Sequence, residues 1–274
     1  MEDKLKMALL DMNEGKPNQG MRGIRDIAAM YRNIFDIDEF DVRSKNEIPG
    51  TNYDVYISSG GPGNPMEGDG KWDKAWYGLV GDLWSYNLQH TYDKKYMFFI
   101  CHSFQMACNY FELGTLAPRK STSFGIMPVH LTRFGENDEI FGYLNDPLYA
   151  VDSRDYQLIQ PDLEVFRMNG SKILALEKIR NHVEYERAIM AVRFSDEFVG
   201  TQFHPEADPL GMKIHFQKAD IRDNVIKNFG QKKYDTMMEQ IDDPDKIELT
   251  HDTILPKFIE NAVNKIHANK TVLV

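Results

Sequence analysis

Apolar residues in the first part of the chain form short runs that alternate with longer amphipathic stretches. The near-continuous runs are typical of strands buried on both faces of a parallel sheet, and they fall at 7–11, 53–58 and 96–100. Apolar residues recur at helical spacing over 24–35 and 72–83. A shorter run, 40–43, is typical of an edge strand. This alternation predicts an α/β fold whose parallel strands are joined by right-handed crossovers.

The pattern changes after Gly114, where strands follow one another without intervening helices. The expected strands are Gly125–Thr132, Tyr149–Asp152, Ile173–Lys178, Ala188–Phe194 and Phe198–Phe203. Such additions commonly extend one side of a parallel sheet, so the sheet is expected to be mixed but mainly parallel. From Asp208 onward the chain becomes helical and more charged. The expected helices are Ala219–Phe229, Tyr234–Ile241 and a C-terminal helix with an apolar stripe from Leu255 to Ile266.

Composition excludes several classes of protein. The net charge is −10 and no long Lys/Arg cluster occurs, which argues against nucleic acid or anionic membrane surfaces as partners. No apolar run approaches the roughly 18 residues of a membrane span. The N-terminus lacks the apolar core of a signal peptide, so a cytoplasmic location is expected. The 274 residues contain no convincing linker or repeat, which favours a single domain.

Cys101 follows the buried run 96–100 directly and precedes a helix expected over Ser103–Leu113, with Gly114 as its C′ residue. A strand–turn–helix junction of this kind presents nucleophiles in hydrolases, and the helix N-terminus lowers a thiol pKa. The alternative is a buried structural cysteine, which is the interpretation we favour for Cys108. Two cysteines on one strand–helix unit do not make a disulfide framework.

The segment Gly200–Glu206 supplies the partner that a catalytic cysteine requires. A strand leads to His204, Pro205 ends it, and Glu206 follows two positions after the histidine. A thiol nucleophile needs a base, and the base needs a carboxylate that fixes its tautomer. Alone the tripeptide is a weak signal, because most histidines at strand ends are surface residues.

The glycine-rich stretch Ser59–Pro65 follows the buried run 53–58. No Gly-Lys-Ser/Thr follows it, so it is not a phosphate-binding P-loop. Glycines after a buried strand let backbone N–H groups approach a substrate oxygen, as an oxyanion hole requires. A plain tight turn is the alternative.

Three stretches together resemble the class I (triad) glutamine amidotransferases, namely Ser59–Gly63, Cys101–Gln105 and Gln202–Glu206. Their order and spacing agree with the family, and the match runs from Met7 to about Glu206. The resemblance implies a Rossmann-like three-layer domain spanning 1–274. Its core would cover about 6–206, followed by a helical extension over about 208–274.

The resemblance also implies roles for individual residues. Cys101 would attack the side-chain amide of glutamine, His204 would act as general base and then acid, and Glu206 would orient His204. The backbone N–H groups of Gly61 and His102 would hold the oxyanion. The implied substrate-binding residues are Gly63, Gln105, Ser153, Arg154 and Tyr156. We expect no cofactor and no metal. A separate synthetase chain would accept the ammonia. Whether the chain forms a homodimer is left open by the sequence.

This sequence departs from the family at the nucleophile turn, where Phe99 and Ser103 replace glycines. Phe99 needs room, whereas Ser103 is expected to sit in an ordinary first helical turn with its hydroxyl on the backbone. We therefore expect Ser103→Gly to change stability by no more than about 1 kcal/mol. The stretch Ser153–Tyr156 takes the place of the family segment that lines the glutamine pocket, and in it Arg154 and Asp155 replace the family's His and Gly. A γ-glutamyl peptidase or acyltransferase, or a catalytically weak binding protein on the same scaffold, remain alternatives.

The segment Asp208–Thr250 lies outside the family's usual core. Because it follows Glu206 closely, it is expected to cap or flank the active-site pocket. A peripheral helical decoration or a dimer surface is an equally weighted alternative.

Overall fold

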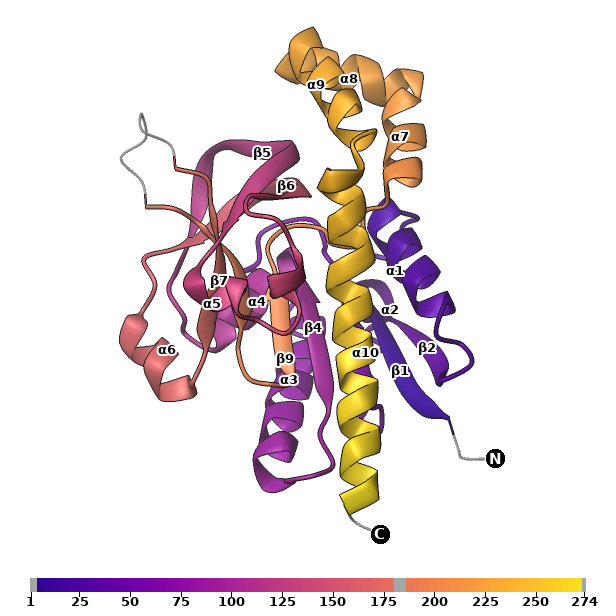
Figure 1. Cartoon of the computed structure of the whole chain (residues 1–274), viewed down its shortest axis with the longest axis vertical. Coiled ribbons are helices and arrows are strands. Elements are labelled where there is room, and N and C mark those ends of the chain that lie inside the picture. The colour runs from indigo at the N-terminus through magenta and orange to yellow at the C-terminus, as the bar shows by residue number, and fades with distance from the viewer. Residues whose placement is uncertain (1–3, 180–185, 273–274) are drawn as a thin grey trace.

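The computed structural model describes residues 4–179 and 186–272 (Figure 1). Within these residues the strands form one nine-stranded mixed sheet in the order β2-β1-β3-β4-β9-β8-β7-β5-β6. The parallel part consists of β2 (Phe35–Asp41), β1 (Leu5–Asp11), β3 (Val55–Ser58), β4 (Tyr96–Ile100) and β9 (Phe198–Thr201). Antiparallel pairings add β8 (Ile189–Arg193), β7 (Lys172–Glu177), β5 (Thr115–Leu131) and β6 (Leu148–Ile159).

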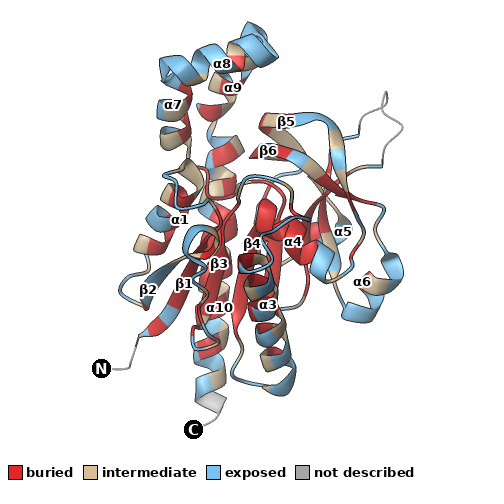
Figure 2. Cartoon of the chain, turned by 180° about the vertical axis from the view of Figure 1, so that it is seen from behind, coloured by how far each residue is buried: buried red, intermediate tan, exposed pale blue. Residues whose placement is uncertain are grey.

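Helices cover both faces of the parallel part because its strands are apolar on both sides. In β1, Met7 and Leu9 pack with α1 (Gln19–Ala29) and α10 (Leu249–Val272). Ala8 and Leu10 belong to the opposite core, with α3 (Trp72–Gln89) and α4 (His102–Tyr110). Figure 2 shows the buried central strands between these helices. The predicted three-layer α/β architecture is confirmed.

The predicted helical C-terminal extension is also present. It comprises α7 (Pro209–Gln217), α8 (Ala219–Phe229), α9 (Gln231–Ile241) and a short π-helical turn, η2 (Pro244–Glu248), before α10. Figure 1 shows α7, α8 and α9 standing together at one end of the molecule, from which α10 returns along the sheet. A third apolar core joins these helices to β5 and β6, and its members include Met212, Phe216, Met237, Ile126 and Val151.

Several boundaries differ from the prediction. The strand expected at 40–43 is β2, which ends at Asp41, because the Asp41 side chain accepts the Ser44 N–H and caps the short helix α2 (Val42–Lys45). Helix α4 ends at Tyr110 rather than Leu113, and Glu112, not Gly114, takes the left-handed conformation. Gly114 instead allows close packing, since a Cβ there would lie 2.9 Å from the Ile159 carbonyl oxygen.

The antiparallel part is more elaborate than the sequence indicated. Strands β5 and β6 extend well beyond the expected 125–132 and 149–152. Helix α6 (Leu163–Asn169), short helix α5 (Arg133–Glu136) and 3-10 turn η1 (Phe141–Tyr143) interrupt a region expected to contain strands alone. Polar side chains along β5 and β6 bond to each other and interrupt the apolar runs, so the sequence pattern did not predict the full length of these strands. No helix in the described part of the chain is long and apolar enough to cross a membrane.

Candidate active site

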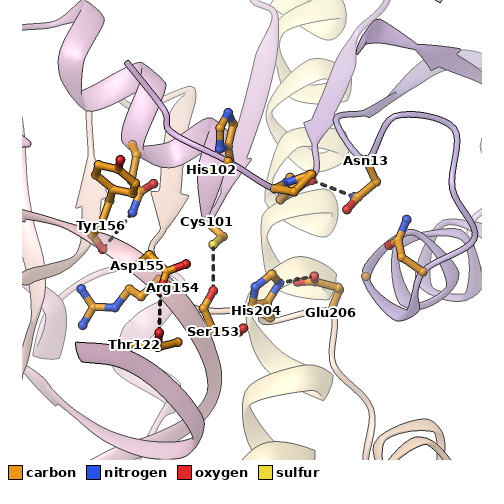
Figure 3. A pocket seen from close by; sticks show the side chains of 17 residues that line it. Asn13, Cys101, His102, Thr122, Ser153, Arg154, Asp155, Tyr156, His204 and Glu206 are labelled. Carbon is orange, nitrogen blue, oxygen red and sulfur yellow. Dashed lines mark hydrogen bonds and ion pairs between the residues drawn. The ribbon is translucent and has the colours of Figure 1, made fainter. Parts of the chain in front are cut away.

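Cys101 lies at the carboxyl end of β4, on the turn into α4. Its φ is +50° and its ψ is −101°, a conformation that costs a non-glycine residue energy and that occurs at nucleophile turns. The turn is held because Cys101 N–H donates to the Thr201 carbonyl on β9 at 2.8 Å. The residue is 6% exposed and faces a pocket of about 440 Å³ (Figure 3).

Ser103 fixes this turn more firmly than expected. Its hydroxyl is fully buried, donates to the Ser58 carbonyl at 2.8 Å, and accepts the Ile100 N–H at 2.9 Å. As expected, Ser103 lies in the first turn of α4 and its hydroxyl bonds backbone groups, but one of these groups belongs to β3 and not to that turn. The hydroxyl joins the end of β3 to the end of β4, a contact between distant segments that sequence spacing does not reveal.

His204 lies beyond the carboxyl end of β9, next to β4. Its backbone N–H donates to the Val151 carbonyl on β6 at 2.9 Å, and its Nδ1 is 2.7 Å from Glu206 Oε1. Burial disfavours the imidazolium, but the Glu206 carboxylate and the Cys101 thiol outweigh it and raise the pKa of His204 well above its ordinary value. With Nδ1 occupied by the carboxylate, Nε2 is the nitrogen available for proton transfer.

The glycine loop brings backbone close to both groups. A Cβ added at Gly60 would lie 2.9 Å from His204 Cε1 and 3.4 Å from Cys101 Cβ, so only glycine fits between them. Asn13 Nδ2 donates to the Gly60 carbonyl at 2.8 Å and holds the loop from the end of β1. At Gly61 a Cβ would lie 2.4 Å from the Met12 carbonyl oxygen.

Arg43 on α2 braces the other end of this loop. Its Nη1 donates to the Pro62 carbonyl at 2.6 Å, and its guanidinium lies over the Trp72 ring at 4.7 Å. Trp72 in turn packs against His102, the first residue of α4, with ring centroids 6.5 Å apart. The glycine loop and the nucleophile helix are thus connected through a cation–π contact.

His102 follows the cysteine but has the wrong surroundings for a base. His102 is 2% exposed, its Nε2 is buried without a hydrogen-bond partner among the described residues, and its ring extends away from Cys101 in Figure 3. Burial, together with the nearby Arg43, lowers the pKa of His102 to about 4. The ring is therefore neutral near pH 7.

Strand β6 supplies one wall of the pocket, and its residues alternate in direction. Ser153 is exposed, and its carbonyl is 3.8 Å from Cys101 Sγ. Asp155 is also exposed, and its Oδ1 accepts a hydrogen bond from Thr122 at 2.6 Å. The Arg154 side chain is buried instead, with Nε donating to both carboxylate oxygens of Asp152 at 3.0 and 3.1 Å. Its Nη2 lies 3.3 Å from Glu177.

The other residues to which the resemblance assigns a role also lie around this pocket. Gly61, Gly63, His102, Gln105 and Tyr156 all line the pocket. Gln105 Nε2 donates to the Tyr156 carbonyl at 3.1 Å and to Gln202 Oε1 at 2.9 Å. Gln202 Nε2 lies 3.7 Å from Cys101 Sγ. Gln105 is thereby locked beside the nucleophile.

Sequence reasoning missed four pocket residues, namely Asn13, Asn18, Gly20 and Thr122. Asp155 stood in the expected pocket stretch without an expected role, although it lies two positions after Ser153 and side chains of a strand alternate. No group of three or more potential ligands suited to a metal ion occurs in the residues that the structure describes.

Of the two expected arrangements, a cap over the Cys101 pocket or a position beside it, the structure has the second. No residue of the segment Asp208–Thr250 lines that pocket. Met212, His215 and Phe216 of α7 instead line a neighbouring cavity of about 180 Å³, which shares His204 and Glu206 with it. The segment therefore flanks the site, while α8 and α9 stand further out (Figure 1).

Solved structures with the same fold include known amidotransferases. A glutamine amidotransferase of Thermotoga maritima has a TM-score of 0.68 at 16% identity, covering 96% of this chain and 99% of the other. A protein of Thermoplasma acidophilum described as a putative GMP synthase subunit gives 0.53 at 17%, covering 100% and 99%. The glutaminase domain of Trypanosoma brucei CTPS, solved with bound acivicin, gives 0.54 at 13%, covering 74% and 86%.

Sequence comparison identifies the family more directly. No curated protein sequence matches the chain. The family model described as glutamine amidotransferase class-I matches residues 24–223, which is most of the chain and includes the Cys101 turn and the His204–Glu206 segment. The chain belongs to the class I glutamine amidotransferase family.

Proposed function

We propose that this protein hydrolyses the side-chain amide of glutamine through Cys101, His204 and Glu206. The observation that carries the proposal is the constructed turn at Cys101, whose φ of +50° presents the thiol beside a histidine already hydrogen-bonded to a buried carboxylate at 2.7 Å. A buried structural cysteine requires neither the strained turn nor the histidine–carboxylate pair.

The reaction proceeds in two halves. Cys101 Sγ forms a bond to the side-chain carbonyl carbon, and its proton passes by way of His204 to the leaving nitrogen as the C–N bond breaks and ammonia departs. His204 then takes a proton from water, the hydroxyl oxygen attacks the thioester, and the C–S bond breaks to release glutamate. Glu206 stabilises the imidazolium in both halves.

The oxyanion of each tetrahedral intermediate would be held by the backbone N–H groups of Gly61 and His102. The loop contact from Arg43 and the rigid packing of His102 support this role, because oxyanion donors act best when fixed before the reaction. Gln105, Gly63, Ser153 and Tyr156 would surround the glutamate part, and Asp155 offers a carboxylate for its α-ammonium group. Arg154 would contribute backbone only.

The ammonia acceptor would belong to another chain. The likeness to a CTPS glutaminase domain and to a putative component of GMP synthase supports a synthetase as partner. The helices and strands of the described residues belong to the sheet, to the helices that cover it or to the α7–α9 extension, so none of them forms a synthetase domain.

Release of glutamate and ammonia from glutamine by the purified chain tests the proposal. Cys101→Ala is expected to abolish the release, whereas a variant in which Cys108, the buried cysteine of α4, is replaced by Ala should retain it. Glutamate release that survives Cys101→Ala would contradict the proposed nucleophile.

A further inference from the structure

The small cavity beside the catalytic pair differs in chemistry from the main pocket. Its volume is about 180 Å³, and its apolar walls come from three separate elements, with Phe124 on β5, Val151 on β6, and Met212 and Phe216 on α7. Phe124 and Phe216 meet edge to face with centroids 5.9 Å apart. A dry apolar cavity of about 150 Å³ accommodates benzene, so this one has room for a group of that size.

The cavity is placed where a leaving group would need space. Both it and the main pocket are lined by Gly20, Ser153, His204 and Glu206. His204, the general acid of the proposed reaction, therefore borders both spaces. With the glutamate part in the main pocket, a substituent on the amide nitrogen would have to pass His204 to reach the apolar cavity. Glutamine itself, which releases ammonia, has no group to fill it.

The charges around the cavity select among substituents. No lysine or arginine is among its described lining residues. His215 lines it, but burial, and after it Lys218, lower the pKa of that side chain. Glu206, at 1% exposure, adds a buried carboxylate. A carboxylate on the leaving amine, as in a γ-glutamyl amino acid, would find no lysine or arginine among these lining residues and would lie near the buried Glu206 carboxylate, so it would be costly to desolvate.

We propose that the preferred substrates are γ-glutamyl amides of apolar primary amines, with the aryl or alkyl group of the leaving amine held between Phe124, Met212 and Phe216. The inference rests on the hydrolytic function proposed above. The bonds made and broken are the same, except that the nitrogen protonated by His204 leaves as the apolar amine in place of ammonia.

A series of substrates tests the proposal on the unmodified protein. The probes are glutamine, γ-glutamylmethylamide, γ-glutamylbenzylamide and γ-glutamylglycine, each followed by glutamate release. We expect kcat/KM for the benzylamide to exceed that for the methylamide at least about tenfold, as burial of several methylene equivalents predicts, and γ-glutamylglycine to be poorest. A kcat/KM that falls as the amine grows more apolar would overturn the proposal.

A variant with a matched control locates the effect. Met212→Trp fills the cavity and should lower the benzylamide-to-glutamine ratio of kcat/KM at least about tenfold. Leu210→Trp, on the same helix with a side chain 69% exposed, should leave that ratio unchanged. Equal ratios in the two variants would place the amine elsewhere. If glutamine is hydrolysed and the benzylamide is not, only this inference fails, whereas loss of every activity rejects the proposed function together with it.

Discussion

Gly200 on β9 lies directly opposite Phe99 on β4 in the parallel register of these central strands. A Cβ added at Gly200 would lie 3.0 Å from Phe99 Cβ and 2.9 Å from Phe104 Cδ2. Phe99 itself is fully buried and packs edge to face against Phe194 and Phe198. The family's glycine before the nucleophile is thus replaced by an aromatic residue, and the glycine that makes room for it stands on the neighbouring strand.

This relationship predicts that Gly200→Ala destabilises the fold by about 1–3 kcal/mol, the usual cost of overpacking a core. Phe99→Gly should be destabilising as well, because it leaves a cavity. The double variant should be more stable than the sum of the two single effects implies, since each substitution relieves the other. A double-mutant cycle of denaturant unfolding measures the coupling, and strictly additive effects would show that the two positions are independent.

The two cysteines are expected to differ sharply in reactivity. Cys101 faces the pocket, while burial raises the pKa of the Cys108 thiol well above its ordinary value. A diazo-ketone analogue of glutamine should therefore label Cys101 well ahead of Cys108 at neutral pH. Peptide mass spectrometry reads the two sites separately. Equal labelling, or none, would contradict a catalytic Cys101.

Replacing His204 should cost more than replacing Glu206. His204→Ala removes proton transfer, which is worth about 10²–10⁴-fold in rate, whereas Glu206→Gln removes only charge support and orientation. Because Glu206 raises the pKa of His204, the Glu206→Gln variant should also show a lower His204 pKa. Histidine NMR titration measures that shift. A His204→Ala variant with most of its activity would identify this histidine as structural.

The bonds of Ser103 revise the expected effect of Ser103→Gly upward. Loss of the hydroxyl removes the hydrogen bonds that the buried Ser58 carbonyl and Ile100 N–H make with it, which lowers the free energy of unfolding by about 1–3 kcal/mol. Ser103→Ala removes the same bonds without adding backbone freedom, so it separates the two contributions. Thermal or denaturant unfolding measures both variants. A change under about 0.5 kcal/mol in each would mean that the bonds contribute little net stability.

His102 should make stability depend on pH. Its folded pKa of about 4 lies below the value of about 6.5 expected when unfolded, so only the unfolded chain takes up the proton between these limits. Stability is therefore unaffected above about pH 6.5 and falls as the pH drops toward 4, by on the order of 3 kcal/mol. The difference in unfolding free energy between wild type and His102→Gln should change over this window. A pH-independent difference would place the His102 ring in contact with water.

The alternation of apolar runs predicted the parallel half of the fold because buried strands and amphipathic helices differ in period. Cys101 and His204 could be paired from sequence because both follow buried strands, and carboxyl ends of parallel strands share one edge of a sheet. The partner of Ser103 could not be predicted, since Ser58 is distant in sequence and only the fold brings it close. Polar faces concealed the length of β5 and β6.

The direction of the Arg154 side chain could be predicted only in part from the sequence. Its side chain lies in the same row as Asp152, with Ser153 and Asp155 in the other, and this parity is available from the sequence once the strand is known. Which row faces the pocket is decided by the pairing of β6 with β5 and by the contact of Val151 with His204. The resemblance made Arg154 an expected substrate-binding residue, because it belongs to the stretch that takes the place of the family's glutamine pocket.

The alternation of β6 has a consequence for how this enzyme family diversifies. Ser153 and Asp155 face the pocket, while Arg154 forms buried ion pairs with Asp152 on the same strand and with Glu177 on β7. Neighbouring residues of β6 are thus under different constraints, one pair facing the pocket and the other pair stabilising the fold. We therefore expect mutations of Ser153 and Asp155 to change which substrates are accepted without unfolding the protein, so that new specificities would be accessible by single steps through folded intermediates. Substitutions of Asp152 and Arg154 are expected to be limited by their cost to folding stability.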